Sequence, residues 1–187
     1  MLKGQRAAID IGSHSTKVLE YKPSKKGIII TNINRIGGIN DEGLLEEIQK
    51  MKSKKITLMI HGANSTLLDL EDEEKPEKFL KERVKSLSKE GYNADYIELD
   101  ENYLFSYIQR DTVDEIVGPI SKKKDIVAID TSPSAMYYLS KLYDEFESNI
   151  FFNIGHLSSE MLIIHHNEII KYDKINIGIS QLIEDIK

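Results

Sequence analysis

The sequence of 187 residues contains no cysteine, and this absence excludes several kinds of chemistry at once. Without cysteine the chain has no disulfide framework, no thiol nucleophile and no cysteine-ligated zinc. A chain of this length can bury a core that does not need such cross-links. The absence of cysteine also fits a protein of the reducing cytoplasm.

Long apolar runs and a basic surface are missing as well. The first glycine turn follows a handful of apolar residues, too few for the apolar region of a signal peptide. No run approaches the roughly 20 residues that span a bilayer. The formal net charge is −6 and the lysines are spread among acidic residues, which argues against nucleic acid as a partner. We therefore expect a soluble protein that can still dock on a membrane partner.

What the sequence does contain is an alternation of strand-like and helix-like segments, which predicts an α/β fold. Three antiparallel strands open the chain, followed by a helix that Asp41 caps and by a buried strand. The middle predicts a small βαββαβ unit and a further helix, with Ser132 as N-cap and Pro133 in the first turn. The expected strands cover residues 6–11, 17–21, 28–33, 55–60, 66–70, 94–99, 103–109, 125–129, 149–154, 160–165 and 168–175, and the expected helices 41–52, 79–88, 112–122, 132–146 and 179–186.

A segment near the start of the chain is repeated near its end. AIDIGSHSTKVLEY aligns with FFNIGHLSSEMLII, and matched residues such as Gly12 and Gly155 are always 143 positions apart. Each copy leads into another strand and a further glycine, Gly37 or Gly38 in the first and Gly178 in the second. Long-period repetition of a whole supersecondary unit indicates a duplicated subdomain.

Each copy has the composition of a phosphate loop. Glycine lets the backbone approach a phosphate, successive N–H groups bind the anion, and serine or threonine hydroxyls add donors. Asp10 can hold a hydrated Mg²⁺ ion, and Lys17 can supply a positive charge. The alternative is an ordinary hairpin turn, but two aligned copies favour phosphate binding. The candidate residues are Asp10, Gly12, Ser13, His14, Ser15, Thr16 and Lys17 in the first copy and Asn153, Gly155, Ser158 and Ser159 in the second.

These motifs carry a family resemblance. AIDIGSHSTKVLEYK resembles the first phosphate motif of the actin, Hsp70 and sugar-kinase superfamily, and most closely that of PilM, the type IV pilus assembly family related to FtsA. FFNIGHLSSEMLIIHHNEIIKYDKINIGISQLIEDI resembles the PilM segment with the second phosphate motif, and DIVAIDTSPSAMYYLSKL is also similar to PilM. The similarity runs in order along nearly the whole chain.

The resemblance implies an actin-like, ribonuclease H-like α/β fold. Residues 1–64 would form the first part of subdomain IA and residues 130–148 its returning helix. Residues 65–129 would form an inserted, small α+β subdomain of the IC type, and residues 149–187 the start of a IIA-like repeat.

The resemblance also implies a function. PilM-like proteins bind ATP with Mg²⁺ between their two halves, and they clasp the cytoplasmic tail of the inner-membrane protein PilN in a groove between IA and IC. We therefore expect a cytoplasmic scaffold, peripheral at the inner face of the cell membrane through its partner. The alternatives are a scaffold like the type II secretion L proteins, or a fragment of an ATPase or small-molecule kinase of the same superfamily.

Two departures from the family pattern argue against ATP hydrolysis. Asn153 stands where the second motif normally has aspartate, which removes a carboxylate that could place metal or water. The sequence also stops before the region that holds adenine and ribose in this superfamily, so the chain is either naturally short or a fragment. We expect weak nucleotide binding. An unfinished IIA subdomain would expose strand edges and apolar surface, which an oligomer or another partner would cover.

The remaining candidates point to structure more than to chemistry. His165 and His166 are adjacent at the end of a strand and should point to opposite faces, so a histidine zinc site is not expected. Tyr137, Tyr138 and Tyr143 are expected to pack in the core. No nucleophile elbow or Ser-His-Asp order indicates covalent catalysis.

Overall fold

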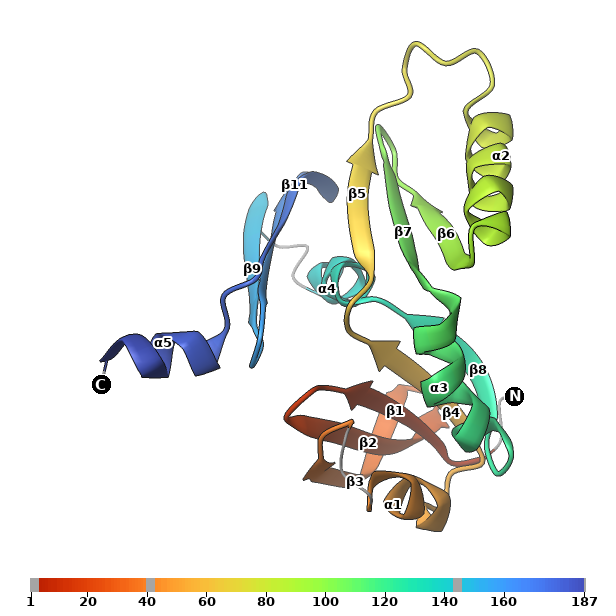
Figure 1. Ribbon diagram of the computed structural model, residues 1–187, viewed down its shortest axis with the longest axis vertical. Coiled ribbons are helices and arrows are strands. Elements are labelled where there is room, and N and C mark those ends of the chain that lie inside the picture. The colour runs from red at the N-terminus through yellow and green to blue at the C-terminus, as the bar shows by residue number, and fades with distance from the viewer. Residues whose placement is uncertain (1–3, 40–42, 143–145, 187) are drawn as a thin grey trace. The chain divides into compact units, whose positions relative to one another are not determined.

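The computed structural model describes residues 4–39, 43–142 and 146–186 (Figure 1). The chain forms two compact units. The first combines Met1–His61 with Val113–Asp130, and the second combines Gly62–Thr112 with Thr131–Lys187. The finer division into IA, IC and IIA parts stays a prediction.

The first unit is built on a five-stranded sheet with the order β3-β2-β1-β4-β8. The three opening strands pair antiparallel, as predicted, whereas β4 runs parallel to both β1 and β8. The strands are β1 (Arg6–Ile11), β2 (Ser15–Ser24), β3 (Gly27–Gly37), β4 (Lys55–Ile60) and β8 (Asp125–Asp130).

Alternation of side chains gives this sheet one well-buried face. Residues at every second position of β1, of β4 and of the first part of β2 are buried, as period-2 patterning requires. Helix α1 (Leu44–Lys50) adds Leu44 and Ile48 to the buried set, and helix α3 (Arg110–Ser121) adds Val113, Ile116 and Ile120. Pro119 lies in the last turn of α3, where it removes one i→i−4 hydrogen bond, and the helix ends two residues later.

The second unit contains two three-stranded sheets, with the orders β5-β7-β6 and β11-β10-β9. All neighbouring strands in both sheets are antiparallel. The elements are β5 (Asn64–Leu68), α2 (Pro76–Lys89), β6 (Tyr92–Glu98), β7 (Tyr103–Gln109), α4 (Ser132–Ser140), β9 (Ser148–Ile154), β10 (Ser159–His165), β11 (Glu168–Ile175) and α5 (Ile179–Ile186).

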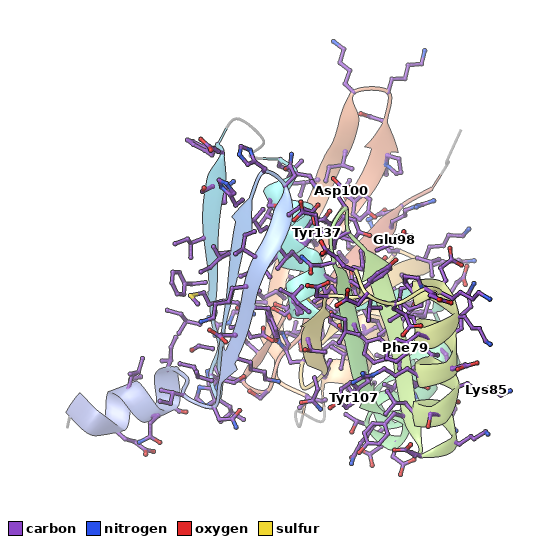
Figure 2. The ribbon with its side chains drawn as sticks, turned by 90° about the horizontal axis from the view of Figure 1, so that it is seen from above. Phe79, Lys85, Glu98, Asp100, Tyr107 and Tyr137 are labelled. Carbon is purple, nitrogen blue, oxygen red and sulfur yellow. The ribbon has the colours of Figure 1, made fainter. Side chains whose placement is uncertain are left out.

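Helix α2 packs along β6. Its amphipathic character follows from its sequence, and Figure 2 shows Lys85 on the side of the helix that points away from the strands. Leu80 is fully buried, and the Arg83 guanidinium lies 5.1 Å from the centre of the buried Phe105 ring on β7. Cation–π and apolar contacts therefore hold this helix on the sheet.

A single apolar cluster joins both sheets of the second unit through α4. Its members are Leu99, Leu104, Met136, Tyr137, Leu162, Ile164 and Ile169. Tyr137 is buried as predicted, but Tyr138 is 56% exposed, so its expected core position is wrong. The reason is the 100° step between consecutive helical residues, which turns Tyr138 away from the cluster. Tyr143 lies outside the described residues.

Element limits differ from the sequence prediction at several helix ends. Helix α2 begins at Pro76, earlier than expected, because proline is well suited to the first helical turn. In α4 the N-cap is Thr131 and not Ser132, and Pro133 occupies the first turn as predicted. The predicted cap Asp41 lies outside the described residues. Among residues 4–39, 43–142 and 146–186, no helix is long and apolar enough to cross a membrane.

The repeat seen in the sequence is present in the backbone. The hairpin pairs β1–β2–β3 and β9–β10–β11 share one order and one antiparallel arrangement. Both also contain a bulge at the same step, between Glu20 and Tyr21 in β2 and between Ile163 and Ile164 in β10. The bulge leaves Thr31 and Ile170 without a strand partner. A shared irregularity at matched positions supports duplication more strongly than shared strands do.

Candidate functional site

The first phosphate-loop candidate is the turn between β1 and β2. Gly12 has no room for a side chain, because a Cβ there would lie 2.6 Å from the Ser15 carbonyl oxygen. A Cβ on Gly38 would lie 2.2 Å from the Ser13 carbonyl oxygen, so Gly38 is the second glycine of the motif. The Ile39 N–H donates to the Gly12 carbonyl at 3.0 Å and holds the turn against this segment.

Asp10, at the end of β1, lies between two basic side chains. Its Oδ2 accepts from Lys17 Nζ at 2.8 Å, and its Oδ1 lies 2.6 Å from His61 Nε2. Burial raises the pKa of the Asp10 carboxyl, but the hydrogen bonds and charges of His61 and Lys17 outweigh burial and hold that pKa below its ordinary value.

The Asp10 cluster limits how a metal could bind. Both carboxylate oxygens are already engaged, so a hydrated Mg²⁺ ion would compete with the Lys17 ammonium for Oδ2. A carboxylate of this kind suits Mg²⁺, which takes oxygen ligands and retains several waters. Asp10 therefore fits an outer contact to hydrated Mg²⁺ better than direct coordination, and this role remains a prediction.

The predicted phosphate ligands of the first loop divide into two groups. Ser13, His14 and Lys17 are exposed and Ser15 is half-buried. Thr16 is different, because its side chain lies on the covered face of β2 and is fully buried. Its hydroxyl has no hydrogen-bond partner among the described residues. As placed, Thr16 cannot offer its hydroxyl to an anion in the turn.

The second loop repeats the backbone of the first. Gly155 donates its N–H to the Ser158 carbonyl at 2.9 Å, and a Cβ there would approach that oxygen to 2.8 Å. A Cβ on Gly178 would lie 2.3 Å from the His156 carbonyl oxygen. The Ile179 N–H donates to the Gly155 carbonyl at 2.9 Å, matching the bond from Ile39 to Gly12. The two turns are thus closed in the same way.

The hydroxyls of the second loop serve its own structure. Ser159 Oγ donates to the Ile177 carbonyl at 2.7 Å, and Ser180 Oγ donates to the His156 carbonyl at 2.7 Å. These bonds fix the loop to the segment that enters α5. Ser159 would have to give up its bond to Ile177 before it could donate to a phosphate.

The polar pair at the base of the second loop differs in charge from the pair at the base of the first loop. Asn153 lies opposite Glu160 across β9 and β10, in the register where Asp10 lies opposite Lys17 across β1 and β2. Asn153 Nδ2 donates to Ser132 Oγ at 2.8 Å and to Glu160 Oε2 at 3.2 Å. An acidic residue therefore occupies the position where the first copy has its lysine.

Tyr172 completes this polar group. Its hydroxyl donates to Glu160 Oε1 at 2.9 Å, and the Glu160 side chain is buried. Burial raises the pKa of the Tyr172 hydroxyl, and the Glu160 carboxyl raises it further, so this hydroxyl remains a donor. The network is fully satisfied and suits structural support of the loop.

Sequence reasoning did not assign four residues to these sites, namely His61, Glu160, Ser132 and Tyr172. Glu160 could have been identified from the sequence, because the 143-position offset of the repeat aligns it with Lys17. The others come from elements whose pairing the sequence alone does not specify. His61 follows β4, which lies beside β1 only through a parallel pairing of distant segments.

Comparison with known proteins gives a fold but no family. No family model matches the chain, and no curated protein matches it in sequence. Among solved structures, a chain of a PilM-PilN type IV pilus biogenesis complex matches with a TM-score of 0.74 and 14% identity. The match covers 99% of this chain and 65% of that one. This chain therefore spans less than two thirds of that protein.

Two further structures support the same fold. A Bacteroides thetaiotaomicron protein with an actin-like ATPase fold and unknown function matches with a TM-score of 0.63 and 10% identity, over 98% of this chain and 73% of its own. The cytoplasmic domain of EpsL, an inner membrane component of the Vibrio cholerae type II secretion system, matches with a TM-score of 0.59 and 9% identity, over 92% of this chain and 71% of its own. The chain has an actin-like ATPase fold, as predicted.

Proposed function

We propose that this chain acts as a PilM-like assembly scaffold that binds the cytoplasmic tail of a PilN-like inner-membrane protein. The observation that carries the proposal is the match over 99% of the chain to a protein solved in a PilM-PilN complex. The order of motifs along the sequence points the same way. On this proposal the protein is cytoplasmic and reaches the inner face of the membrane through its partner.

The proposal assigns ATP a weak or absent role. The first loop is suited to an anion, since Ser13 and Lys17 are exposed beside a backbone turn. The second loop is poorly suited, because Glu160 occupies the position of the lysine and Ser159 already donates to Ile177. An acidic group at that position disfavours the negative charge of a bound phosphate.

Peptide binding tests the scaffold role directly. A fluorescent peptide with the tail sequence of the PilN-type protein from the same genome is titrated with the intact chain, and a scrambled peptide serves as the control. We expect saturable binding with a Kd in the micromolar range or tighter, on the order of −8 kcal/mol. No binding of the native tail would overturn the proposal. Binding of only the tail from a type II secretion partner would favour the secretion alternative.

Nucleotide binding is tested separately by calorimetry with Mg-ATP and by phosphate release. We expect no measurable heat with up to about 1 mM nucleotide. A Kd of about 1 mM corresponds to a binding free energy of roughly −4 kcal/mol. Tight Mg-ATP binding with turnover would favour the ATPase or kinase alternative.

A further inference from the structure

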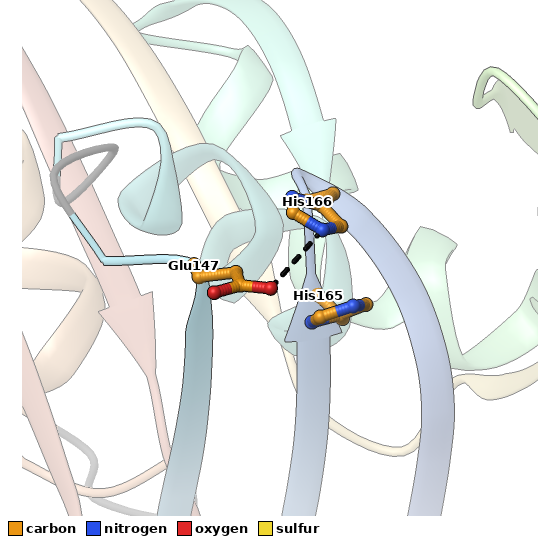
Figure 3. Close-up of side chains that lie close together, drawn as sticks. All are labelled: Glu147, His165 and His166. Carbon is orange, nitrogen blue, oxygen red and sulfur yellow. Dashed lines mark ion pairs between the residues drawn. The ribbon is translucent and has the colours of Figure 1, made fainter.

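The turn between β10 and β11 brings three metal-ligating side chains together (Figure 3). One nitrogen from each of His165 and His166 and one carboxylate oxygen of Glu147 all lie within 4.8 Å of one another. His166 Nε2 is 3.2 Å from Glu147 Oε1, and the two imidazole centres are 4.1 Å apart. All three side chains are exposed, so an ion from solution can reach them.

The backbone explains why two adjacent histidines converge. Residues next to each other in a strand point to opposite faces, which is why the sequence predicted divergence. β10 ends at His165, however, and both His166 and Asn167 adopt positive φ, at 48° and 67°. Two such residues in a row are the signature of a tight hairpin turn. The turn rotates the His166 imidazole to the side of His165, so the predicted divergence is wrong.

Several bonds hold this turn in place. The His166 N–H donates to the Glu147 carbonyl at 2.9 Å, and Lys141 Nζ donates to the Asn167 carbonyl at 3.1 Å. Ser148 Oγ lies 2.8 Å from His165 Nδ1. An imidazole that is held at one nitrogen by a hydrogen bond ligates a metal through the other, and such bonds orient the ring for the metal. The ligands are therefore partly preorganised.

The distances are close to those that a small transition-metal ion needs. With bonds of about 2.0–2.1 Å, tetrahedral zinc places its ligand atoms about 3.4 Å apart. The pair His166 Nε2 and Glu147 Oε1, at 3.2 Å, already meets this spacing. The His165 nitrogen lies within 4.8 Å of the other two ligand atoms, so a small movement of this side chain would bring it to the same spacing.

The donor set selects the class of ion. Two imidazoles and one carboxylate suit zinc, nickel, copper and cobalt, whereas Mg²⁺ and Ca²⁺ prefer all-oxygen ligands. Three protein ligands also leave at least one position for water, as in zinc sites with open coordination. We propose that Glu147, His165 and His166 form a binding site for one divalent transition-metal ion of the zinc class. This site shares no residue with the Asp10 cluster and is independent of the proposed scaffold function.

Titration with Zn²⁺ tests the site. The intact chain, freed of any polyhistidine tag, is titrated by calorimetry, and Co²⁺ absorption in the visible range reports the ligand geometry. We expect one ion per chain. His165→Asn and His166→Asn should each weaken Zn²⁺ binding at least tenfold, and the double variant should abolish it. Glu147→Gln should weaken it less, because one of three ligands becomes a poorer donor.

Two matched controls keep the test specific. His156→Asn and Glu101→Gln alter a histidine and an exposed glutamate outside the cluster, and both should keep wild-type affinity. A second readout is thermal stability, which Zn²⁺ should raise for the wild type and not for the double histidine variant. Absence of Zn²⁺ binding by the wild-type chain would overturn the proposal. So would wild-type affinity in the double variant, or equal losses in the controls.

Discussion

The Asn153 amide donates a hydrogen bond of 3.2 Å to the Glu160 carboxyl, at the positions where the first copy of the repeat forms an ion pair. The two copies thus share a backbone and differ in charge. In the first copy the acidic residue lies on the first strand and a lysine faces it, whereas in the second copy the acidic residue lies on the second strand and an amide faces it. The repeat kept its turn while its polar chemistry changed.

Loss of Glu160 should destabilise the second unit. In Glu160→Ala the Tyr172 hydroxyl loses its acceptor and Asn153 loses one of two acceptors in a mostly buried setting. We expect a loss of about 1–3 kcal/mol in the free energy of unfolding, measured by urea denaturation. The control Glu82→Ala removes an exposed glutamate of α2 with only a surface ion pair, which should cost less than about 0.5 kcal/mol. Equal losses in both variants would contradict a supporting role for Glu160.

The second glycine of each copy should resist even the smallest substitution. In Gly38→Ala and Gly178→Ala the new methyl group would meet a carbonyl oxygen at 2.2 Å and 2.3 Å. We expect each to cost about 1–3 kcal/mol of unfolding free energy, because the backbone must shift. Gly118→Ala in α3 is the matched control, since a Cβ there meets nothing within 4 Å. It should stabilise the chain by up to about 1 kcal/mol. A larger loss of stability in Gly118→Ala than in the other two variants would rule out close packing at Gly38 and Gly178.

Asp10 should make the first unit more stable at neutral than at acidic pH. Its folded pKa lies below the ordinary value of 3.8, so its ionised form stabilises the fold above that value, and the stabilisation disappears as the pH falls through the folded pKa. Asp10→Asn should therefore cost about 1–2 kcal/mol at pH 7 and progressively less toward pH 3, as measured by denaturation at each pH.

The control for this pH series is Asp72→Asn, in the exposed loop before α2. Its effect should be small at every pH. A cost of Asp10→Asn that stays constant from pH 7 to pH 3 would show that the carboxylate charge is not what stabilises the cluster.

Two adjacent lysines before β8 should differ sharply in importance. The buried Lys124 ammonium donates to the Met51 carbonyl at 2.6 Å and to the Ser53 carbonyl at 3.0 Å. Burial lowers the pKa of Lys124, although the Glu20 carboxylate partly offsets this. Lys124→Met should cost about 1–3 kcal/mol by leaving these carbonyls without a donor. Lys123→Met, at the exposed neighbouring position, should change the unfolding free energy by less than about 0.5 kcal/mol. Similar losses would mean that the two carbonyl contacts contribute little.

The sequence predicted the repeat, the order of strands and helices, and the actin-like fold, because these depend on local period and on glycine spacing. The positive φ at His166 was harder to predict than the turn itself, since a histidine in this conformation has no local sequence signal comparable to glycine. The contact between His61 and Asp10 depends on parallel pairing of β1 with β4, which joins segments about 50 residues apart. Burial of the Thr16 side chain follows from strand register, which its residue type does not specify.

The matched bulges have a practical consequence for protein engineering. Each bulge places one extra residue, Thr31 or Ile170, against the facing strand and bends the strand locally, so deleting that residue would keep the flanking strand pairs in register and remove the bend. Because both hairpins carry the irregularity at the same step, a graft of one hairpin onto the other must include it. Hybrid chains whose junction lies before or after the bulge would keep a compatible strand geometry. Hybrid chains whose junction lies within the bulge would not.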